Sequence, residues 1–272
     1  MSTTVAEFHT VVESLWPTRY AEGWDAPGLI SGDPDDEVDR VLLAVDAVRA
    51  TVDEAVSTGA DVLLTHHPLL LRGVTSVAET TSKGSLLATL IRSRCALIAA
   101  HTNADIVDDG TSSVLAKRLG LLDQQPIVPG EREGTGLGRV GRLEHPLALG
   151  RLALALGELL PATATGIRVA GDYDQEIRTV ALCGGAGDSL LDHPAVTAAD
   201  VYITSDLRHH PASEARERAL VGSGPALIDT SHWASEWLWL DTAAAQLRSA
   251  LPDVEVVVSE LRTDPWEFVI TQ

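Results

Sequence analysis

Cysteine, methionine and aromatic side chains are scarce in this chain of 272 residues. It has two cysteines and one methionine, and 4% of its residues are aromatic. Two cysteines make no disulfide framework, and their spacing fits no zinc-binding pattern. Cys95 and Cys183 each lie in an apolar, strand-like run, so we expect both to be buried and neither to act as a nucleophile.

Basic residues are also few. There are 20 lysines and arginines against 39 acidic residues, which gives a net charge of −19. A protein that binds nucleic acid needs a basic face to neutralise phosphates. The charge balance therefore argues against nucleic acid as a main partner.

Long apolar runs are missing as well. No stretch approaches about 18 uncharged apolar residues, so no transmembrane helix and no membrane partner are expected. The first residues, MSTTVAEFHTVVESLW, lack the basic segment followed by an apolar segment that marks a secretory signal. We therefore expect a cytoplasmic protein. The apolar fraction of 45% is typical of a globular chain with a sizeable core.

What the chain does contain is an alternation of short strand-like runs and amphipathic helical stretches. Such alternation predicts βαβ units, hence an α/β fold with mostly parallel sheets. The stretch QQPIVPGEREGTGLGRVGRLEHP interrupts it with glycine, proline and charge. We predict a first α/β unit over residues 1–125, a connecting strand–helix–strand region over 126–177, and a second unit over 178–272. The last residues, WEFVITQ, are expected to form a strand.

The two predicted units resemble each other. GADVLLTHHPLL in the first is similar to AADVYITSDLRHHPA in the second, and CALIAAHTNAD is similar to PALIDTSHWAS. The order of strands and helices around these segments is also the same. We interpret this as an internal duplication, with the two units facing a central cleft.

Histidines and acidic residues follow four of the predicted strands. In open parallel sheets, ligands bind outside the carboxyl ends of the strands. Imidazole and carboxylate donors together suit Zn, Fe, Mn, Co or Ni. The residues that follow the four strands are His66 and His67, then His101, Asn103 and Asp105, then Asp206, His209 and His210, then His232 and Glu236.

The spacing of these residues favours more than one ion. His232 and Glu236 are four residues apart, so they share a face if a helix begins there. His66 and His67 are adjacent, and neighbouring side chains on extended backbone point to opposite sides. Three imidazoles and two carboxylates are too many for one tetrahedral zinc and suit two ions with open positions for water.

Each motif taken alone has an ordinary explanation. A pair of histidines is usually a solvated loop, and HTNAD could be a turn with a helix N-cap. The coincidence of several such motifs at strand ends is what favours a metal site. The glycine-rich stretch CGGAGDSL could cradle an anion or form a tight turn, and the turn is favoured. Phosphate-loop, HExxH and GxSxG motifs are absent.

Six segments, in chain order, resemble the NIF-three-like dinuclear-metal family, whose bacterial members are often labelled GTP cyclohydrolase type-2 homologues. They are WDAPGL, DVLLTHHPLLLRG, AAHTNAD, LCGGAGDSL, ITSDLRHH and DTSHWASEW. The resemblance implies a two-part α/β fold, a metal pair between the parts and a ring-shaped homohexamer. It also implies that His66, His67, Asp105 and His232 bind metal and that Glu236 bridges the two ions.

His101 and His210 match polar positions of the family and are candidates for contacts with the ligands or the substrate. The chain departs from the family pattern at Ala26 and Ile30, where Asn and Gln are usual, and at Ala104 and Ser205. None of these changes removes a predicted ligand.

Two functions remain open from the sequence. The first is a metal-dependent hydrolase that cleaves C–N or P–O bonds with metal-activated water, in a small-molecule or nucleotide substrate. The alternative is a non-enzymatic metal-binding, regulatory or scaffold assembly.

Overall fold

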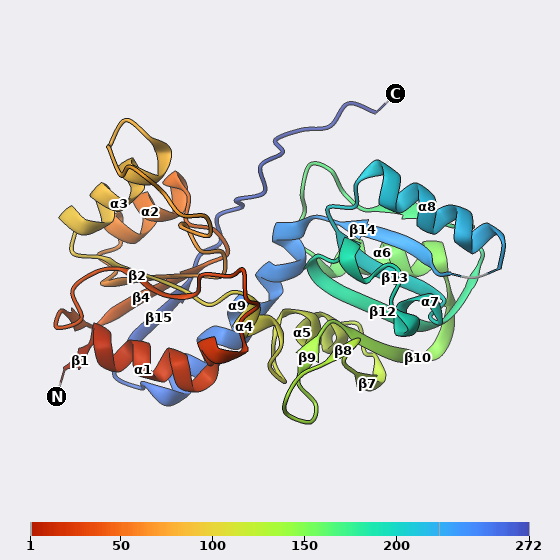
Figure 1. Ribbon diagram of the computed structural model, residues 1–272, viewed down its shortest axis with the longest axis horizontal. Helices are drawn as coiled ribbons and strands as arrows, with labels where there is room; N and C mark the ends of the chain where they lie inside the picture. The colour runs from red at the N-terminus through yellow and green to blue at the C-terminus, as the bar shows by residue number, and fades with distance from the viewer. Residues whose placement is uncertain (1, 223, 272) are drawn as a thin grey trace. The chain divides into compact units, whose positions relative to one another are not determined.

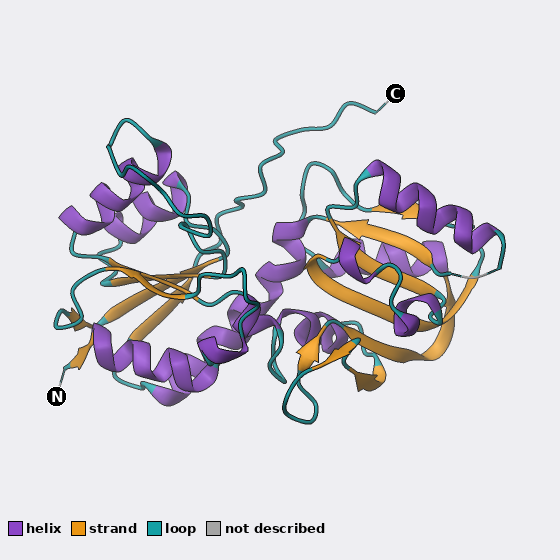
Figure 2. Cartoon of the chain, in the orientation of Figure 1, coloured by secondary structure: helices purple, strands orange, loops and turns teal. Residues whose placement is uncertain are grey.

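The computed structural model describes residues 2–222 and 224–271 and divides into two compact units. Unit 1 contains the residues up to Ala104 together with Leu240–Thr263, and unit 2 contains Asp105–Trp239 with the residues from Asp264 on. Figures 1 and 2 show that each unit has a central sheet covered by helices. The predicted α/β fold class is confirmed.

Unit 1 is built on a five-stranded sheet in the order β15-β4-β5-β6-β2. The first four are parallel, and β2 pairs antiparallel with β6. The bounds are Gly28–Ser31 for β2, Arg40–Ala44 for β4, Val62–Thr65 for β5, Ala96–Ala99 for β6 and Glu255–Val258 for β15. Every residue of β5 and β6 is buried, as continuous apolar runs in parallel sheets generally are.

Helices cover both faces of this sheet. Helices α2 (Arg49–Ser57) and α3 (Ser82–Arg92) bury Val52 and Leu90 in one cluster with Leu63 of the sheet. Helix α1 (Val5–Leu15) lies on the other face (Figure 1). The shorter elements are the strands β1 (Thr3–Thr4) and β3 (Glu37–Val38) and the 3-10 helix η1 (Thr18–Tyr20).

Unit 2 contains a six-stranded mixed sheet in the order β11-β14-β13-β12-β10-β7. Strands β12, β13 and β14 are parallel, whereas the other three pairings are antiparallel. The bounds are Leu122–Gln125 for β7, Arg139–Ala148 for β10, Arg168–Ala170 for β11, Glu176–Ala186 for β12, Val201–Ser205 for β13 and Ala226–Thr230 for β14.

The helices of unit 2 include α5 (Thr111–Arg118), α6 (Leu149–Leu159) and α8 (His209–Leu220). The long helix α9 (His232–Ala250) begins in unit 2, and the boundary between the units falls within it, between Trp239 and Leu240. The small elements are β8 (Val128–Pro129), β9 (Gly136–Leu137), α4 (Thr102–Asp105), η2 (Asp188–Leu190) and α7 (Pro194–Thr197). None of the helices within the described residues combines the length and the apolar character needed to cross a bilayer.

The two sheets share a topology. Strands β4, β5 and β6 are parallel neighbours in chain order, and the earlier strand β2 lies antiparallel beside the last of them. Strands β12, β13, β14 and β11 repeat this arrangement. Helices α1 and α6 stand before the antiparallel strand in each case. The topology agrees with the duplication inferred from the sequence.

The bounds of the units differ from the predicted 1–125, 126–177 and 178–272. Segment 126–177 is part of unit 2, because β10 hydrogen-bonds to β12 in its sheet. Residues 240–263 belong to unit 1, because β15 pairs with β4. Residues 264–271 form no strand, in contrast to the strand expected for WEFVITQ.

Candidate metal-binding sites

In unit 1 three imidazoles meet where β5 and β6 end. Thr65 and Ala99 are paired at the ends of these strands, so the residues that follow them emerge at the same edge. The ring centroids of His66, His67 and His101 are 5.1 to 5.4 Å apart. One ring nitrogen from each lies within 4.8 Å of the others, which is a spacing that a metal ion can bridge.

An oxygen acceptor orients each ring of this group. His66 Nδ1 lies 2.8 Å from the carbonyl oxygen of Ala100, His67 Nδ1 lies 2.7 Å from Asp46 Oδ1, and His101 Nδ1 lies 2.8 Å from Asp25 Oδ1. When Nδ1 is engaged in this way, Nε2 is the nitrogen that can bind a metal. The three rings are therefore set in the tautomer that metal binding requires.

Asp25 is a charged acceptor that sequence reasoning did not single out. Besides His101, it accepts hydrogen bonds from the backbone N–H and the hydroxyl of Thr102, at 3.0 and 2.5 Å. Burial alone would raise the pKa of this carboxyl, but the hydrogen bonds from His101 and Thr102 hold it well below its usual range. Asp25 therefore stays ionised and can fix the orientation of the His101 ring.

The adjacent histidines His66 and His67 each place a ring nitrogen near that of His101. His66 and His67 continue the β4–β5 ladder, with N–H groups bonded to the carbonyls of Ala44 and Val45. The hydroxyl of Thr65 then donates to the carbonyl of His67 at 2.9 Å, which turns the chain at that point. Both rings consequently join one group with His101.

In unit 2 the matching strand ends carry His232, Glu236 and Asp206. His232 opens α9, and Glu236 follows one turn later on the same face, with His232 Nε2 3.0 Å from Glu236 Oε1. His232 Nδ1 lies 2.7 Å from Asp206 Oδ2. Asp206 follows β13 with a φ of +58°, a left-handed conformation that aspartate tolerates better than most residues.

Charge is concentrated on the His232–Glu236 pair. Glu236 is 3% exposed. Burial by itself would lower the pKa of His232, but the carboxylates of Glu236 and Asp206 outweigh it and raise that pKa to about 11. Before a metal binds, the imidazole is a cation between two carboxylates, and a divalent ion would take the place of its proton.

Gly185, at the end of β12, forms the wall against which this pair packs. A Cβ atom at this position would come within 2.3 Å of Glu236 Oε1 and 3.2 Å of His232 Nε2, and φ is +69°. The N–H groups of Gly184 and Gly185 donate to the hydroxyls of Ser112 and Ser235 at 3.0 and 2.9 Å. The glycine-rich stretch thus allows close approach. Instead of the expected tight turn, residues 183–186 end β12 and Asp188–Leu190 form η2, and these two N–H groups are engaged within the protein.

Asp105 is the last residue of α4 and is buried. The hydroxyl of Thr111 donates to its carboxylate at 2.5 Å. Burial raises the pKa of the neighbouring Cys183 to about 12, and the carboxylates of Asp105 and Glu236 both add to this rise. Asp105 and Glu236 are therefore both close enough to Cys183 of β12 to affect its thiol.

His210 does not join these groups. It lies in the exposed first turn of α8, where its ring meets that of His209 edge-on with centroids 5.2 Å apart. Sequence reasoning also gave no orienting role to Asp46. The position of Asp46, two residues after the end of β4 at the same sheet edge, was the signal available for it.

The residues that depart from the family pattern are accommodated by the fold. Ala104 is fully buried, and Ile30 packs partly buried against the core of unit 1. Ser205 is buried with its hydroxyl 3.2 Å from Thr230 Oγ1 and 3.4 Å from Ser235 Oγ. These substitutions leave the histidine and carboxylate groups intact.

Comparisons with known proteins match this chain to one family over most of its length. A family model described as Duf34/NIF3 (NGG1p interacting factor 3) matches residues 3–265. A Streptomyces coelicolor protein named GTP cyclohydrolase 1 type 2 homolog is 52% identical over 269 residues, which cover 96% of this chain and 93% of that protein. The crystal structure of a hypothetical protein from Staphylococcus aureus superposes with a TM-score of 0.89 at 27% identity, covering 99% of this chain and 100% of that one. A Bacillus cereus protein related to NIF3 gives a TM-score of 0.88 at 23% identity, with the same coverage.

Proposed function

The chain belongs to the Duf34/NIF3 (NGG1p interacting factor 3) family, and from this premise we propose that it binds two divalent metal ions. The proposed ligands are His66, His67, Asp105, His232 and Glu236. His101, which the structure groups with His66 and His67, is proposed to contribute a further nitrogen or to contact the substrate.

One observation carries the proposal. Four imidazoles, those of His66, His67, His101 and His232, each have Nδ1 within 2.8 Å of a carboxylate or carbonyl oxygen. Histidines that bind metals almost always donate their second ring N–H to such an acceptor. Together with the buried carboxylates of Glu236 and Asp105, this donor set fits Zn²⁺, Fe²⁺, Mn²⁺, Co²⁺ or Ni²⁺.

We propose that the metal-loaded protein is a hydrolase acting on a C–N or P–O bond of a small molecule or nucleotide. Divalent ions at such a site make hydroxide available near neutral pH. The chain's own residues would supply orientation and proton handling. Asp25 would hold the His101 ring, and Asp206 would hold the His232 ring. The name of the Streptomyces relative supports a GTP cyclohydrolase type-2-like reaction as the first to test.

Metal content tests the ligand assignment. Elemental analysis of the purified protein should find about two divalent ions per chain. Glu236→Gln should lower this value sharply, because it weakens a carboxylate proposed to bridge both ions. Glu176→Gln, at an exposed position in β12, is the matched control and should leave metal content unchanged. Full metal content in Glu236→Gln would refute the assignment.

Activity tests the hydrolase proposal separately. Metal-loaded protein would be offered GTP, other nucleotides and phosphoesters, with His67→Ala as the reference. Turnover above that reference supports a hydrolase. If full metal content is accompanied by no turnover on any of them, the non-enzymatic metal-binding or scaffold function is favoured instead.

We also propose that the protein is cytoplasmic and assembles into a ring-shaped homohexamer, as the family resemblance implies. Light scattering coupled to size-exclusion chromatography measures the mass in solution. A mass near six chains is expected, and a concentration-independent monomer would contradict the proposal.

A further inference from the structure

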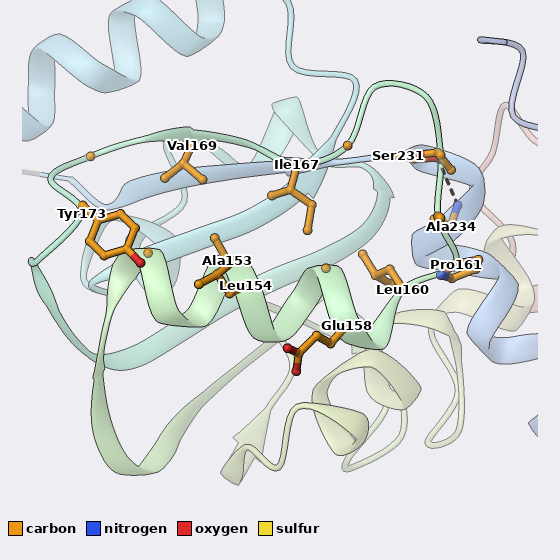
Figure 3. A pocket seen from close by; sticks show the side chains of 16 residues that line it. Ala153, Leu154, Glu158, Leu160, Pro161, Ile167, Val169, Tyr173, Ser231 and Ala234 are labelled. Carbon is orange, nitrogen blue, oxygen red and sulfur yellow. Dashed lines mark hydrogen bonds between the residues drawn. The ribbon is translucent and has the colours of Figure 1, made fainter. Parts of the chain in front are cut away.

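An apolar groove of about 620 Å³ runs along unit 2 between α6 and β11. Figure 3 shows Ile167 and Val169 facing the helix across the groove, with Leu154 on the helix below them. Tyr173 closes one end, and Ser231 lies at the other. The groove is largely apolar and open to solvent, since Leu154, Val169 and Tyr173 are each more than 40% exposed.

The groove borders an open sheet edge. Strand β11 is the outermost strand of its sheet, and in the described part of the chain no strand pairs with its other edge. An unpaired edge is a template for a further strand. Side chains of β11 alternate as strand geometry requires, so Ile167, Val169 and Gly171 line the groove.

The opposite face of β11 also borders a hollow. There Arg168 and Ala170 line a second hollow of about 420 Å³ against α8, together with His209 and Arg216. Its acidic residue, Asp229, forms an ion pair with Arg168. This hollow is also mostly apolar, and the guanidinium groups of Arg168 and Arg216 are its cationic side chains. A strand added to β11 would thus meet a hollow on each face, and the hollow beside α8 carries the two arginines.

The C-terminal segment has the complementary pattern. Four apolar side chains of this segment are between 58% and 77% exposed: Trp266, Phe268, Val269 and Ile270. Exposed apolar residues on a protein surface are usually scattered singly, whereas these four lie within five consecutive positions. In an extended chain, Trp266, Phe268 and Ile270 share one face, and Glu267 lies on the other. The first set suits the apolar groove, and Glu267 suits the guanidinium groups of Arg168 and Arg216 in the second hollow.

We propose that residues 265–271 of one copy of this chain add as a strand to the β11 edge of a second copy. The apolar side chains enter the groove between α6 and β11, and Glu267 faces Arg168 and Arg216. The tail is anchored to unit 2 at Asp264, whose carboxylate accepts a hydrogen bond from Ser231 at 2.5 Å. Beyond that anchor its apolar side chains are exposed while the groove of the same unit stays open, so the occupant comes from another copy. Addition of the tail at this edge requires no bound metal.

Disulfide trapping in the full-length chain tests the occupant directly. The double variant Leu154→Cys with Phe268→Cys is oxidised and run on a denaturing gel without reductant. The native cysteines are buried and stay out of the reaction. A covalent dimer or ladder that reductant removes is expected. A cross-link confined to single chains would show that the tail fills its own groove and would overturn the proposal, as would free thiols throughout.

A matched pair and a charge exchange complete the test. Leu220→Cys with Phe268→Cys places the first thiol on a residue of α8 that is 61% exposed but outside the groove, and little cross-linking is expected. Equal cross-linking in this control would mean random collision.

Glu267→Arg should reduce the yield of the trapped dimer several-fold, and adding Arg216→Glu should restore it. Both readouts are independent of metal content and turnover, so they can fail while the proposed function holds.

Discussion

Asp61 and Asp200 occupy equivalent positions in the two units, each directly before the middle strand of three parallel strands. The carboxylate of each accepts hydrogen bonds from two successive backbone N–H groups near the start of the neighbouring strand, β4 or β12. For Asp61 the donors are Asp39 and Arg40, at 2.8 and 2.9 Å, and for Asp200 they are Arg178 and Thr179, at 2.9 and 2.7 Å.

The backbone around these two aspartates matches as well. The N–H of each donates to the preceding parallel strand, at Arg40 or Thr179, and the carbonyl of each accepts from the following one, at Ala96 or Ala226. The duplication inferred from GADVLLT and AADVYIT thus extends to individual hydrogen bonds.

Asp200→Asn should destabilise unit 2 in a pH-dependent way. Burial raises the pKa of Asp200, but hydrogen bonds from Thr179 and Arg178 outweigh it and lower the pKa below 3.8 in the folded state. The carboxylate therefore stabilises the fold fully above that value, and this contribution is lost as pH falls through the folded pKa. We expect a deficit of about 1–2 kcal/mol at neutral pH, measured by urea unfolding.

The deficit of Asp200→Asn should shrink in unfolding experiments at pH 3. Asp174→Asn, at an exposed turn, is the control and should unfold like the unmodified protein. An equal deficit at both pH values would contradict the charged hydrogen-bond role.

Gly185→Ala should impair the His232–Glu236 pair. The added methyl would come within 2.3 Å of Glu236 Oε1, and the left-handed backbone adds strain of about 1–2 kcal/mol. We expect reduced metal content by elemental analysis and a lower melting temperature. Gly157→Ala in α6, where the new Cβ meets its nearest neighbour at 3.8 Å, should keep full metal content. Full metal content in Gly185→Ala would show that Glu236 is not held there for binding.

Asp46→Asn should weaken metal binding without unfolding unit 1. The variant removes the charged acceptor 2.7 Å from His67 Nδ1, which fixes the ring orientation. Losses of such acceptors lower metal affinity by about 10–100-fold. Competition with a chromogenic chelator measures the change. Asp53→Asn, exposed in α2, is the control, and equal affinities in both variants would argue against the role of Asp46.

The two cysteines should be inert in the folded protein. Burial raises the pKa of both the Cys95 and the Cys183 thiol to about 12, so at pH 8 almost no thiolate is present. Iodoacetamide should label neither at pH 8, and both in urea, as read by mass spectrometry. Rapid labelling of the folded chain would show that one of the thiols is accessible and activated.

Much of the candidate site could be predicted from local sequence. Apolar runs such as VLLT and ALIA must be buried strands, and parallel strands end at one sheet edge, so His66, His67 and His101 had to lie close together. The i, i+4 spacing likewise placed His232 and Glu236 on one face of a helix. Each inference depends only on strand and helix geometry.

The other features of the fold and of the candidate site depend on contacts between segments that are distant in the sequence. Nothing in the residues of β15 shows that they pair with β4, more than two hundred positions earlier. The need for glycine at position 185 appears only when Glu236 is packed against it. The strand expected at the C-terminus failed for a related reason: β propensity makes a strand only where a partner edge is available.

The interleaved course of the chain has a consequence for its synthesis. The edge of β4 that β15 covers is completed only by residues 255–258, after all of β5 to β14 has left the ribosome. Until then the nascent first unit carries an open parallel edge, and such edges invite association with other chains. Unit 2 has all the strands of its sheet by residue 230, so it can mature before the unit that began first. Translation order and folding order are thereby uncoupled, and a stop codon before residue 255 would spare the second sheet while leaving the first incomplete.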